Sequence, residues 1–257
     1  MIGAIVGDIV GSIFEYSPMK SIDFPLFNPH SFFTDDTVLT VALADSILTG
    51  DPYEKKMKEY FRRYPNAGYG GTFALWAKSK DDPPYNSWGN GSAMRVSPVG
   101  FAYDNLDEVL DRARESAAMT HNHPEGIKGA QATAACILLA RQGKSKDQIR
   151  DYIENTFHYD LHRSVEAMRP TYRYDISCQG SVPESIICVL ESTDFEHAVR
   201  LAISLGGDAD TMACIAGGIA QALYGGVPEK IKAHALRILD DPLRDVVGRF
   251  SRRYKCG

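Results

Sequence analysis

The sequence predicts an all-helical protein, and three observations support this fold class. Apolar residues recur at the three- and four-residue spacing of helices along the whole chain. No segment shows the alternation expected of a half-buried strand. Breakers such as Pro83-Pro84 and Gly225-Gly226 fall between the periodic segments, as short interhelical connections require. We therefore expect a single compact all-α domain over residues 1–257.

The expected helices follow the periodic segments in order. The first covers 2–15, and Pro25 and Pro29 precede the second. A glycine, Gly143, follows the long helix at 124–142, and Pro228 opens the last helix. We expect the tail at 252–257 to fray. The expected helices are 2–15, 36–49, 53–63, 71–78, 107–119, 124–142, 146–152, 182–190, 194–204, 211–224 and 228–239.

The composition describes an ordinary globular chain. Its 28 basic and 33 acidic side chains give a net charge of −5, and 44% of the residues are hydrophobic. These values exclude a disordered chain and offer no basic patch for duplex nucleic acid. The five cysteines are scattered and never spaced as Cys-x-x-Cys, so we expect neither disulfides nor a zinc knuckle. We expect a cytoplasmic protein.

Two further absences bear on partners. The apolar run at 1–14 is too short to span a bilayer, lacks a basic flank and contains Asp8, so it predicts neither an anchor nor a signal peptide. No heptad seam is visible, and we therefore expect a monomer. The sequence also lacks a Gly-x-Ser-x-Gly elbow, a Walker loop and a His-Glu-x-x-His pair.

The first expected helix has two notable features. Gly3, Gly7 and Gly11 form a ridge without side chains, which lets another backbone approach closely. Asp8 and Glu15 are seven residues apart, so on a helix they lie nearly on one line and can face one site. The alternative is that Asp8 is an ordinary buried polar group and Glu15 an acid at a helix end.

A polar cluster opens the second expected helix. Thr34 or Asp35 can cap the first turn, and acids there interact favourably with the helix dipole. The functional alternative is a site for a hard cation, since the cluster supplies only oxygen ligands that suit Mg²⁺, Mn²⁺ or Ca²⁺ and disfavour zinc. The cluster reads Thr34-Asp35-Asp36-Thr37.

The same chemistry recurs before the expected helix at 211–224. That helix contains almost only small or apolar residues, so we expect it to be buried. Unpaired buried carboxylates are strongly unfavourable, which makes a shared metal a better account here than capping alone. The cluster reads Gly206-Gly207-Asp208-Ala209-Asp210-Thr211.

Two loops carry further candidate residues. The loop at 85–95 is rich in Gly, Asn and Ser, so its backbone N–H groups can cradle a pyrophosphate, although most such loops are simple turns. His121 and His123 are spaced like zinc ligands, but no third nitrogen or sulfur ligand lies nearby. Hydrogen bonding is therefore the favoured role for these two histidines.

Taken in order, these motifs resemble the ADP-ribosylglycohydrolase family. The resemblance extends over residues 3 to 226, and the stretch at 178–184, Cys-Gln-Gly-Ser-Val-Pro-Glu, is also similar to bacterial members. Each motif is weak alone, but the ordered set is specific. The matching motifs are Gly7-Asp8 with Glu15, Thr34-Asp35-Asp36-Thr37, Gly89-Asn90-Gly91-Ser92-Ala93-Met94-Arg95, Thr120-His121 and Gly206-Gly207-Asp208-Ala209-Asp210-Thr211.

The resemblance implies an all-α hydrolase that uses two divalent cations, Mg²⁺ or Mn²⁺, to cleave the bond at C1″ of ADP-ribose conjugates. Glu15 and Asp35 are then the candidate catalytic residues, and Asp8 is structural. The implied metal ligands are Thr34, Asp35, Asp36, Asp208, Asp210 and Thr211. The implied substrate-binding residues are Trp88, Gly89, Asn90, Gly91, Ser92, Met94 and His121.

The expected substrate is thus an ADP-ribose conjugate, including an ADP-ribosylated protein. Segment 17–33, which contains Pro18, Pro25 and Pro29, is expected near the entrance, where it sets substrate choice. Two other functions fit the same motifs. One is an ADP-ribose or nucleotide binding module with weak turnover, and the other is a metal-dependent nucleotide phosphohydrolase.

Overall fold

The computed structural model describes residues 1–80 and 83–256. These residues form helices and no strand, which confirms the predicted all-α class. The helices are α1 (Ile2–Gly11), α2 (Asp35–Thr49), α3 (Tyr53–Arg63), α4 (Gly71–Lys78), α5 (Gly91–Met94), α6 (Ser97–Ala102), α7 (Leu106–Ala118), α8 (Pro124–Arg141), α9 (Lys146–Phe157), α10 (Val165–Met168), α11 (Cys178–Glu191), α12 (Phe195–Ser204), α13 (Ala209–Leu223), α14 (Glu229–Ile238) and α15 (Asp241–Tyr254).

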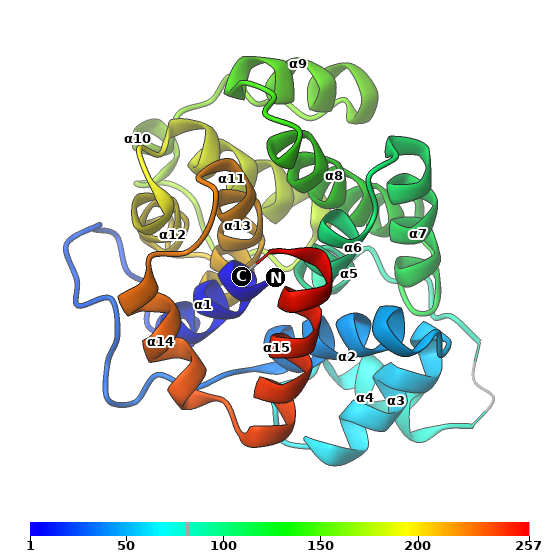
Figure 1. The fold of residues 1–257 in the computed structure, drawn as a ribbon. Helices are drawn as coiled ribbons and strands as arrows, with labels where there is room; N and C mark the ends of the chain where they lie inside the picture. Colours follow the sequence, from blue (N-terminus) through cyan, green and yellow to red (C-terminus); the bar gives the residue numbers. More distant parts are fainter. Residues whose placement is uncertain (81–82, 257) are drawn as a thin grey trace.

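Helices α1 and α13 form the centre of the fold (Figure 1). Their backbones touch at the predicted glycine ridge. A Cβ atom added to Gly3 would lie 2.2 Å from the carbonyl oxygen of Gly217, and one added to Gly7 would lie 1.9 Å from that of Ala213. Since the partner number falls as the α1 number rises, the two helices run antiparallel. The start of α13 therefore lies beside the end of α1.

The other helices cover this central pair. Helices α8, α11 and α12 pack against α13, while α2 packs against α1, α3, α6 and α15 (Figure 1). Both ends of the chain meet at one side chain on α13. Gln221 Oε1 accepts from the Gly3 N–H at 2.9 Å, and its Nε2 donates to the carbonyl of Cys256.

The segment between α1 and α2 crosses the outside of the molecule without forming a helix (Figure 1, blue). Side chains of other elements hold it. Arg200 of α12 donates to the carbonyls of Ile22 and Phe24, at 2.9 and 2.7 Å. Lys20 of the segment donates to the carbonyl of Tyr172, at 2.8 Å. The segment is therefore attached to the helices around it at several points.

The predicted first helix, 2–15, is too long. Helix α1 ends at Gly11, and Ser12 begins the turn out of it. The Ser12 hydroxyl donates to the Ile9 carbonyl at 2.9 Å and accepts from the Phe32 N–H at 3.2 Å, so it ties the segment to the helix end. Glu15 is outside the helix, and the argument that placed Asp8 and Glu15 on one helical line is wrong.

The predicted frayed tail at 252–257 is also wrong for Arg252 to Tyr254, because α15 continues to Tyr254. Gly257 lies outside the described residues. The buried residues of α15, Leu243, Val246, Val247 and Phe250, follow helical spacing. The sequence analysis did not predict the short helices α5, α6 and α10. Helix α11 begins at Cys178 instead of 182, because the Ser177 hydroxyl caps it by accepting from the Gly180 N–H.

All five cysteines are free and buried, in line with the predicted lack of disulfides. None of the described helices is both long and apolar enough to cross a bilayer.

The close contact of α1 and α13 makes a prediction about stability. Gly7→Ala forces a methyl group into the Ala213 carbonyl and should lower the free energy of unfolding by about 3 kcal/mol. Gly71→Ala is the matched control, since its added Cβ meets no atom within 4 Å, and it should change stability by less than about 0.5 kcal/mol. Urea unfolding followed by circular dichroism measures both. Equal stability of the two variants would contradict the contact.

Candidate metal centre and binding cleft

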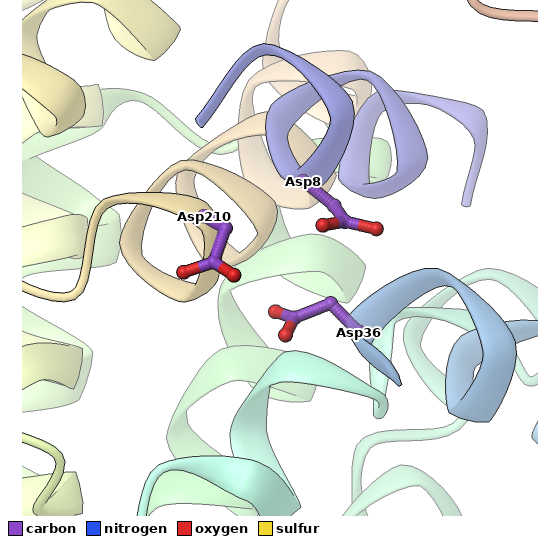
Figure 2. A group of neighbouring side chains, drawn as sticks. All are labelled: Asp8, Asp36 and Asp210. Carbon is purple, nitrogen blue, oxygen red and sulfur yellow. The ribbon is translucent and has the colours of Figure 1, made fainter. Parts of the chain in front are cut away.

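Acidic side chains from three helix ends converge at one place. Asp8 from α1, Asp36 from α2 and Asp210 from α13 point toward one another, with one oxygen of each within 4.8 Å of the others (Figure 2). A second group shares Asp210 and adds Glu15 and Asp208, again within 4.8 Å. The antiparallel contact of α1 and α13 brings these groups together, because it places the start of one helix beside the end of the other.

Asp8 holds the start of α2. Its Oδ2 accepts from the N–H groups of Thr34 and Thr37, at 3.0 and 3.1 Å, and its Oδ1 accepts from the Thr34 hydroxyl at 2.7 Å. Both oxygens are thus occupied by protein donors. These contacts support a structural role for Asp8 and explain how α1 fixes the position of the Thr-Asp-Asp-Thr cluster.

Asp36 and Asp210 retain open coordination capacity. Asp36 Oδ2 accepts from the Thr211 hydroxyl at 3.3 Å, while its Oδ1 is buried and has no hydrogen-bond partner. Asp210 Oδ1 accepts from the N–H of Thr211 at 2.9 Å. A buried carboxylate oxygen without a donor is unfavourable unless a cation or a proton compensates it. Both groups of clustered acids offer only carboxylate oxygens as ligands, which fits Mg²⁺ or Mn²⁺ better than zinc.

The acids strongly perturb one another. Burial, followed by the Asp8 carboxylate, raises the pKa of Asp35 to about 8. Burial raises the pKa of Asp8 to about 6. The pKa values of Asp36 and Asp210 also lie well above the usual range, because each is buried and faces the other carboxylates. The metal-free site therefore binds protons at neutral pH.

These acids line a cleft of about 880 Å³. The described residues along it include the carboxylates of Glu15, Asp35, Asp36, Asp175, Asp208 and Asp210. Arg95 supplies a guanidinium in the same lining, but its Nη2 donates to the Ser116 carbonyl and the Thr120 hydroxyl, at 3.0 and 2.8 Å. Carboxylates therefore outweigh cations in the cleft.

The glycine-rich loop before α5 lies along the same cleft. Its backbone is paired with the start of α11, since the Asn90 N–H donates to the Ile176 carbonyl at 2.8 Å and the Cys178 N–H donates to the Trp88 carbonyl at 2.9 Å. The Asn90 side chain donates to Asp208 Oδ2 at 2.8 Å, which joins the loop to the acid cluster. The 178–184 stretch therefore holds the loop in place.

His121 lies under this loop as a neutral ring. Burial and Arg95 lower its pKa. The Thr120 hydroxyl accepts from Arg95, so its hydrogen goes to His121 Nδ1, 2.7 Å away, and we assign the His121 proton to Nε2. A Cβ atom added to Gly91 would lie 3.1 Å from that nitrogen. Glycine at this position thus leaves room for the Nε2 donor.

The other predicted binding residues fall into two groups. Trp88, Gly89, Asn90, Gly91 and Met94 line the cleft. Ser92 does not, because it is fully buried behind the loop, where its hydroxyl donates to the Gly126 carbonyl at 2.6 Å. The Ser92 side chain therefore fixes the loop, and binding of substrate by its backbone stays a prediction.

The predicted metal ligands Thr34, Asp35 and Thr211 all line the cleft. Asp35 is half-buried and belongs to neither group of clustered acids. His123 caps α8, where its Nδ1 accepts from the Glu125 N–H at 3.1 Å.

Glu15 reaches the cluster from the loop after α1. Its Oε1 accepts from the Tyr174 hydroxyl at 3.2 Å. Sequence reasoning missed Tyr174, since no local motif singles it out. It also missed Tyr69, which lines the cleft together with Gly68, Gly70 and Gly71. The clustered glycines at 68–71 could have indicated a loop at this part of the cleft.

The fold is all-helical, and it brings carboxylates from three helix ends into one cleft. These features define a class of candidate hydrolases in which oxygen ligands can hold a cation. Within that class, the chain belongs to the ADP-ribosylglycohydrolase family, whose sequence model matches residues 1–255. The predicted resemblance is thereby confirmed. Family membership supports an ADP-ribosylhydrolase acting on ADP-ribose conjugates.

Individual relatives agree with this assignment. The chain is 27% identical to the mouse protein named ADP-ribosylhydrolase ARH3, over 88% of this chain and 84% of that protein. It is 25% identical to ADP-ribosylarginine hydrolase Tri1 of Pseudomonas putida, over 89% of this chain and 71% of the relative. A solved structure described as an ADP-ribosylglycohydrolase-related protein complex matches with a TM-score of 0.73 at 27% identity, covering 98% of this chain and 96% of that chain.

The raised pKa values make a prediction about pH. An unfolded Asp has a pKa near 4, so the cost of ionising the clustered acids appears as pH rises toward 8. In chelator, Tm should therefore fall between pH 6 and pH 8, and Asp210→Asn should reduce that fall by about 5 °C. The control Asp104→Asn, whose side chain is 87% exposed, should keep the wild-type slope. Identical slopes for all three proteins would contradict the proposed repulsion.

Proposed function

We propose that this protein is a metal-dependent hydrolase that cleaves the glycosidic bond at C1″ of ADP-ribose conjugates and releases ADP-ribose. The observation that carries the proposal is that two clusters of carboxylates, which share Asp210, lie in the lining of one cleft. The names of the mouse and Pseudomonas putida relatives support the choice of substrate.

We infer that two divalent cations, Mg²⁺ or Mn²⁺, occupy this site. The open carboxylate oxygens and neighbouring hydroxyls suit them, and their charge offsets both the acids and the diphosphate of the substrate. When bound, they supply the charge that orients the ribose hydroxyls and lowers the pKa of a water molecule. The residues that would hold them are Thr34, Asp35, Asp36, Asp208, Asp210 and Thr211.

The chain's own residues account for binding and proton transfer. The Gly91 N–H and the His121 Nε2 donor bind the diphosphate and nucleotide, since the N–H groups of Gly89 and Asn90 already donate to Ser87 and Ile176. Glu15 or Asp35 accepts the proton of the attacking water. As the water oxygen bonds to C1″, the bond from C1″ to the acceptor breaks, and its electron pair leaves with the acceptor.

We also propose that the protein works as a cytoplasmic monomer and does not bind duplex nucleic acid. Its free, buried cysteines fit a reducing compartment. Its acidic net charge of −5 disfavours a phosphate backbone.

The decisive experiment is the release of ADP-ribose from arginine-, serine- and nucleobase-linked conjugates with Mg²⁺, with Mn²⁺ and with chelator. Metal-dependent release from any conjugate supports the proposal. Tight metal-dependent binding of ADP-ribose without release would favour a binding module, and release of phosphate or AMP would favour a phosphohydrolase.

The metal ligands make a second prediction. Asp35→Asn and Asp210→Asn should each remove the rise in Tm caused by Mg²⁺ and lower ADP-ribose release by about a hundredfold or more. Asp104→Asn is the matched control and should retain both properties. Wild-type turnover in either site variant would refute the ligand assignment, and circular dichroism verifies that the helices remain.

Glu15 makes a third prediction, because a proton acceptor acts mainly in the transition state. Glu15→Gln should lower kcat by about a hundredfold or more, while the Kd for ADP-ribose in Mg²⁺ changes less than about threefold. Calorimetry and single-turnover kinetics measure the two quantities. Equal losses of binding and rate would instead assign Glu15 a structural role.

A further inference from the structure

A second cavity adjoins the cleft beyond Glu15. Its volume is about 560 Å³, within the range of small-molecule sites. Glu15, Tyr16 and Tyr174 line both the cavity and the cleft. Lys20 and Arg173 line the cavity but not the cleft. Glu15 thus lies between the acidic cleft and a cavity that is lined by two basic side chains.

The two cations of the cavity converge on one atom. Lys20 Nζ and Arg173 Nη1 both donate to the carbonyl oxygen of Tyr172, at 2.8 and 2.9 Å. Each also donates to a second carbonyl, that of Leu205 for Lys20 and that of Pro170 for Arg173, and both side chains are exposed. The shared acceptor holds the two positive charges close together, so an anion beside them can interact with both. Burial and the neighbouring Arg173 and Arg169 lower the pKa of Lys20, which agrees with this crowding.

The position of the cavity defines which part of a substrate it receives. If ADP-ribose occupies the cleft, with C1″ beside Glu15, the group attached to C1″ projects past Glu15. The adjoining space on that side is the second cavity. This argument rests on the proposed function, because it takes Glu15 as the residue nearest the scissile bond.

We propose that this cavity is the acceptor pocket of the enzyme and that it selects ADP-ribose conjugates whose acceptor leaves as an oxyanion, such as a phosphate or a carboxylate. The Lys20 and Arg173 cations stabilise the negative charge that develops on the leaving oxygen. The electron pair of the broken bond from C1″ to oxygen remains on that oxygen, so no proton donor is needed. An arginine acceptor would instead bring its guanidinium against both cations.

The test compares four conjugates in Mg²⁺: ADP-ribose 1″-phosphate, a C1″-linked acetate ester, an ADP-ribosylserine peptide and ADP-ribosylagmatine. We expect kcat/KM for the two oxyanion conjugates to exceed that for the agmatine conjugate at least tenfold. Arg173→Glu should lower kcat/KM for the oxyanion conjugates at least tenfold without lowering it for agmatine. Comparison of the phosphate and acetate arms identifies which oxyanion the pocket prefers.

Two controls separate charge from folding. Arg173→Lys should retain the preference for oxyanions. Lys144→Glu makes the same change of charge in the turn after α8, about 27 Å along that helix from its start near His121, and should have no effect. A second readout needs no turnover: calorimetry with inorganic phosphate and metal-free protein should show binding that Arg173→Glu weakens at least tenfold.

The outcomes distinguish the two proposals. If Arg173→Glu lowers all four rates equally, or if the wild type prefers agmatine, the acceptor pocket is refuted while the hydrolase function stands. If phosphate binding is the same in Arg173→Glu and the wild type, the anion site is refuted. If no conjugate is cleaved, the hydrolase function fails, and the acceptor assignment fails with it.

Discussion

The contact between the backbones of α1 and α13 is the constraint on which the candidate site depends. Glycine at positions 3, 7 and 217 lets the two helix axes approach more closely than side chains allow. The antiparallel arrangement then sets the end of α1 beside the start of α13 (Figure 1). Asp8 extends this arrangement to α2 by binding the N–H groups of Thr34 and Thr37. Three helix ends are thus fixed relative to one another before any ligand binds.

This rigidity opposes the electrostatics of the site. The carboxylates of Asp36 and Asp210 are buried together, and burial, followed by repulsion from neighbouring carboxylates, raises the pKa of each. Repulsion of this kind would separate mobile segments, but packed helices resist the movement. The fold therefore maintains an unfavourable arrangement of charge whose compensation comes from bound cations or protons. The neutral His121 and the buried Arg95 line the same cleft as the glycine loop.

The sequence predicted those parts that local chemistry determines. The glycine ridge, the all-α class and the acids at the starts of α2 and α13 follow from spacing and residue type, and the structure confirms the first two directly. The end of α1 was missed because the tie between Ser12 and Phe32 joins residues twenty apart. Tyr174 was missed for the same reason, since its bond to Glu15 spans 159 residues. Helix α15 is different, because the sequence analysis did not predict it. The helical spacing of the apolar residues Leu243, Val246 and Phe250 was a local signal for this helix.

The way segment 17–33 is attached has an evolutionary consequence. Arg200 holds the segment through the backbone carbonyls of Ile22 and Phe24, which any residue type supplies. Substitutions there can accumulate without disturbing the glycine contact of α1 and α13. In a duplicated gene, substitutions confined to this surface segment can change the cavity wall formed by Pro18 and Lys20 and leave the central helix pair intact.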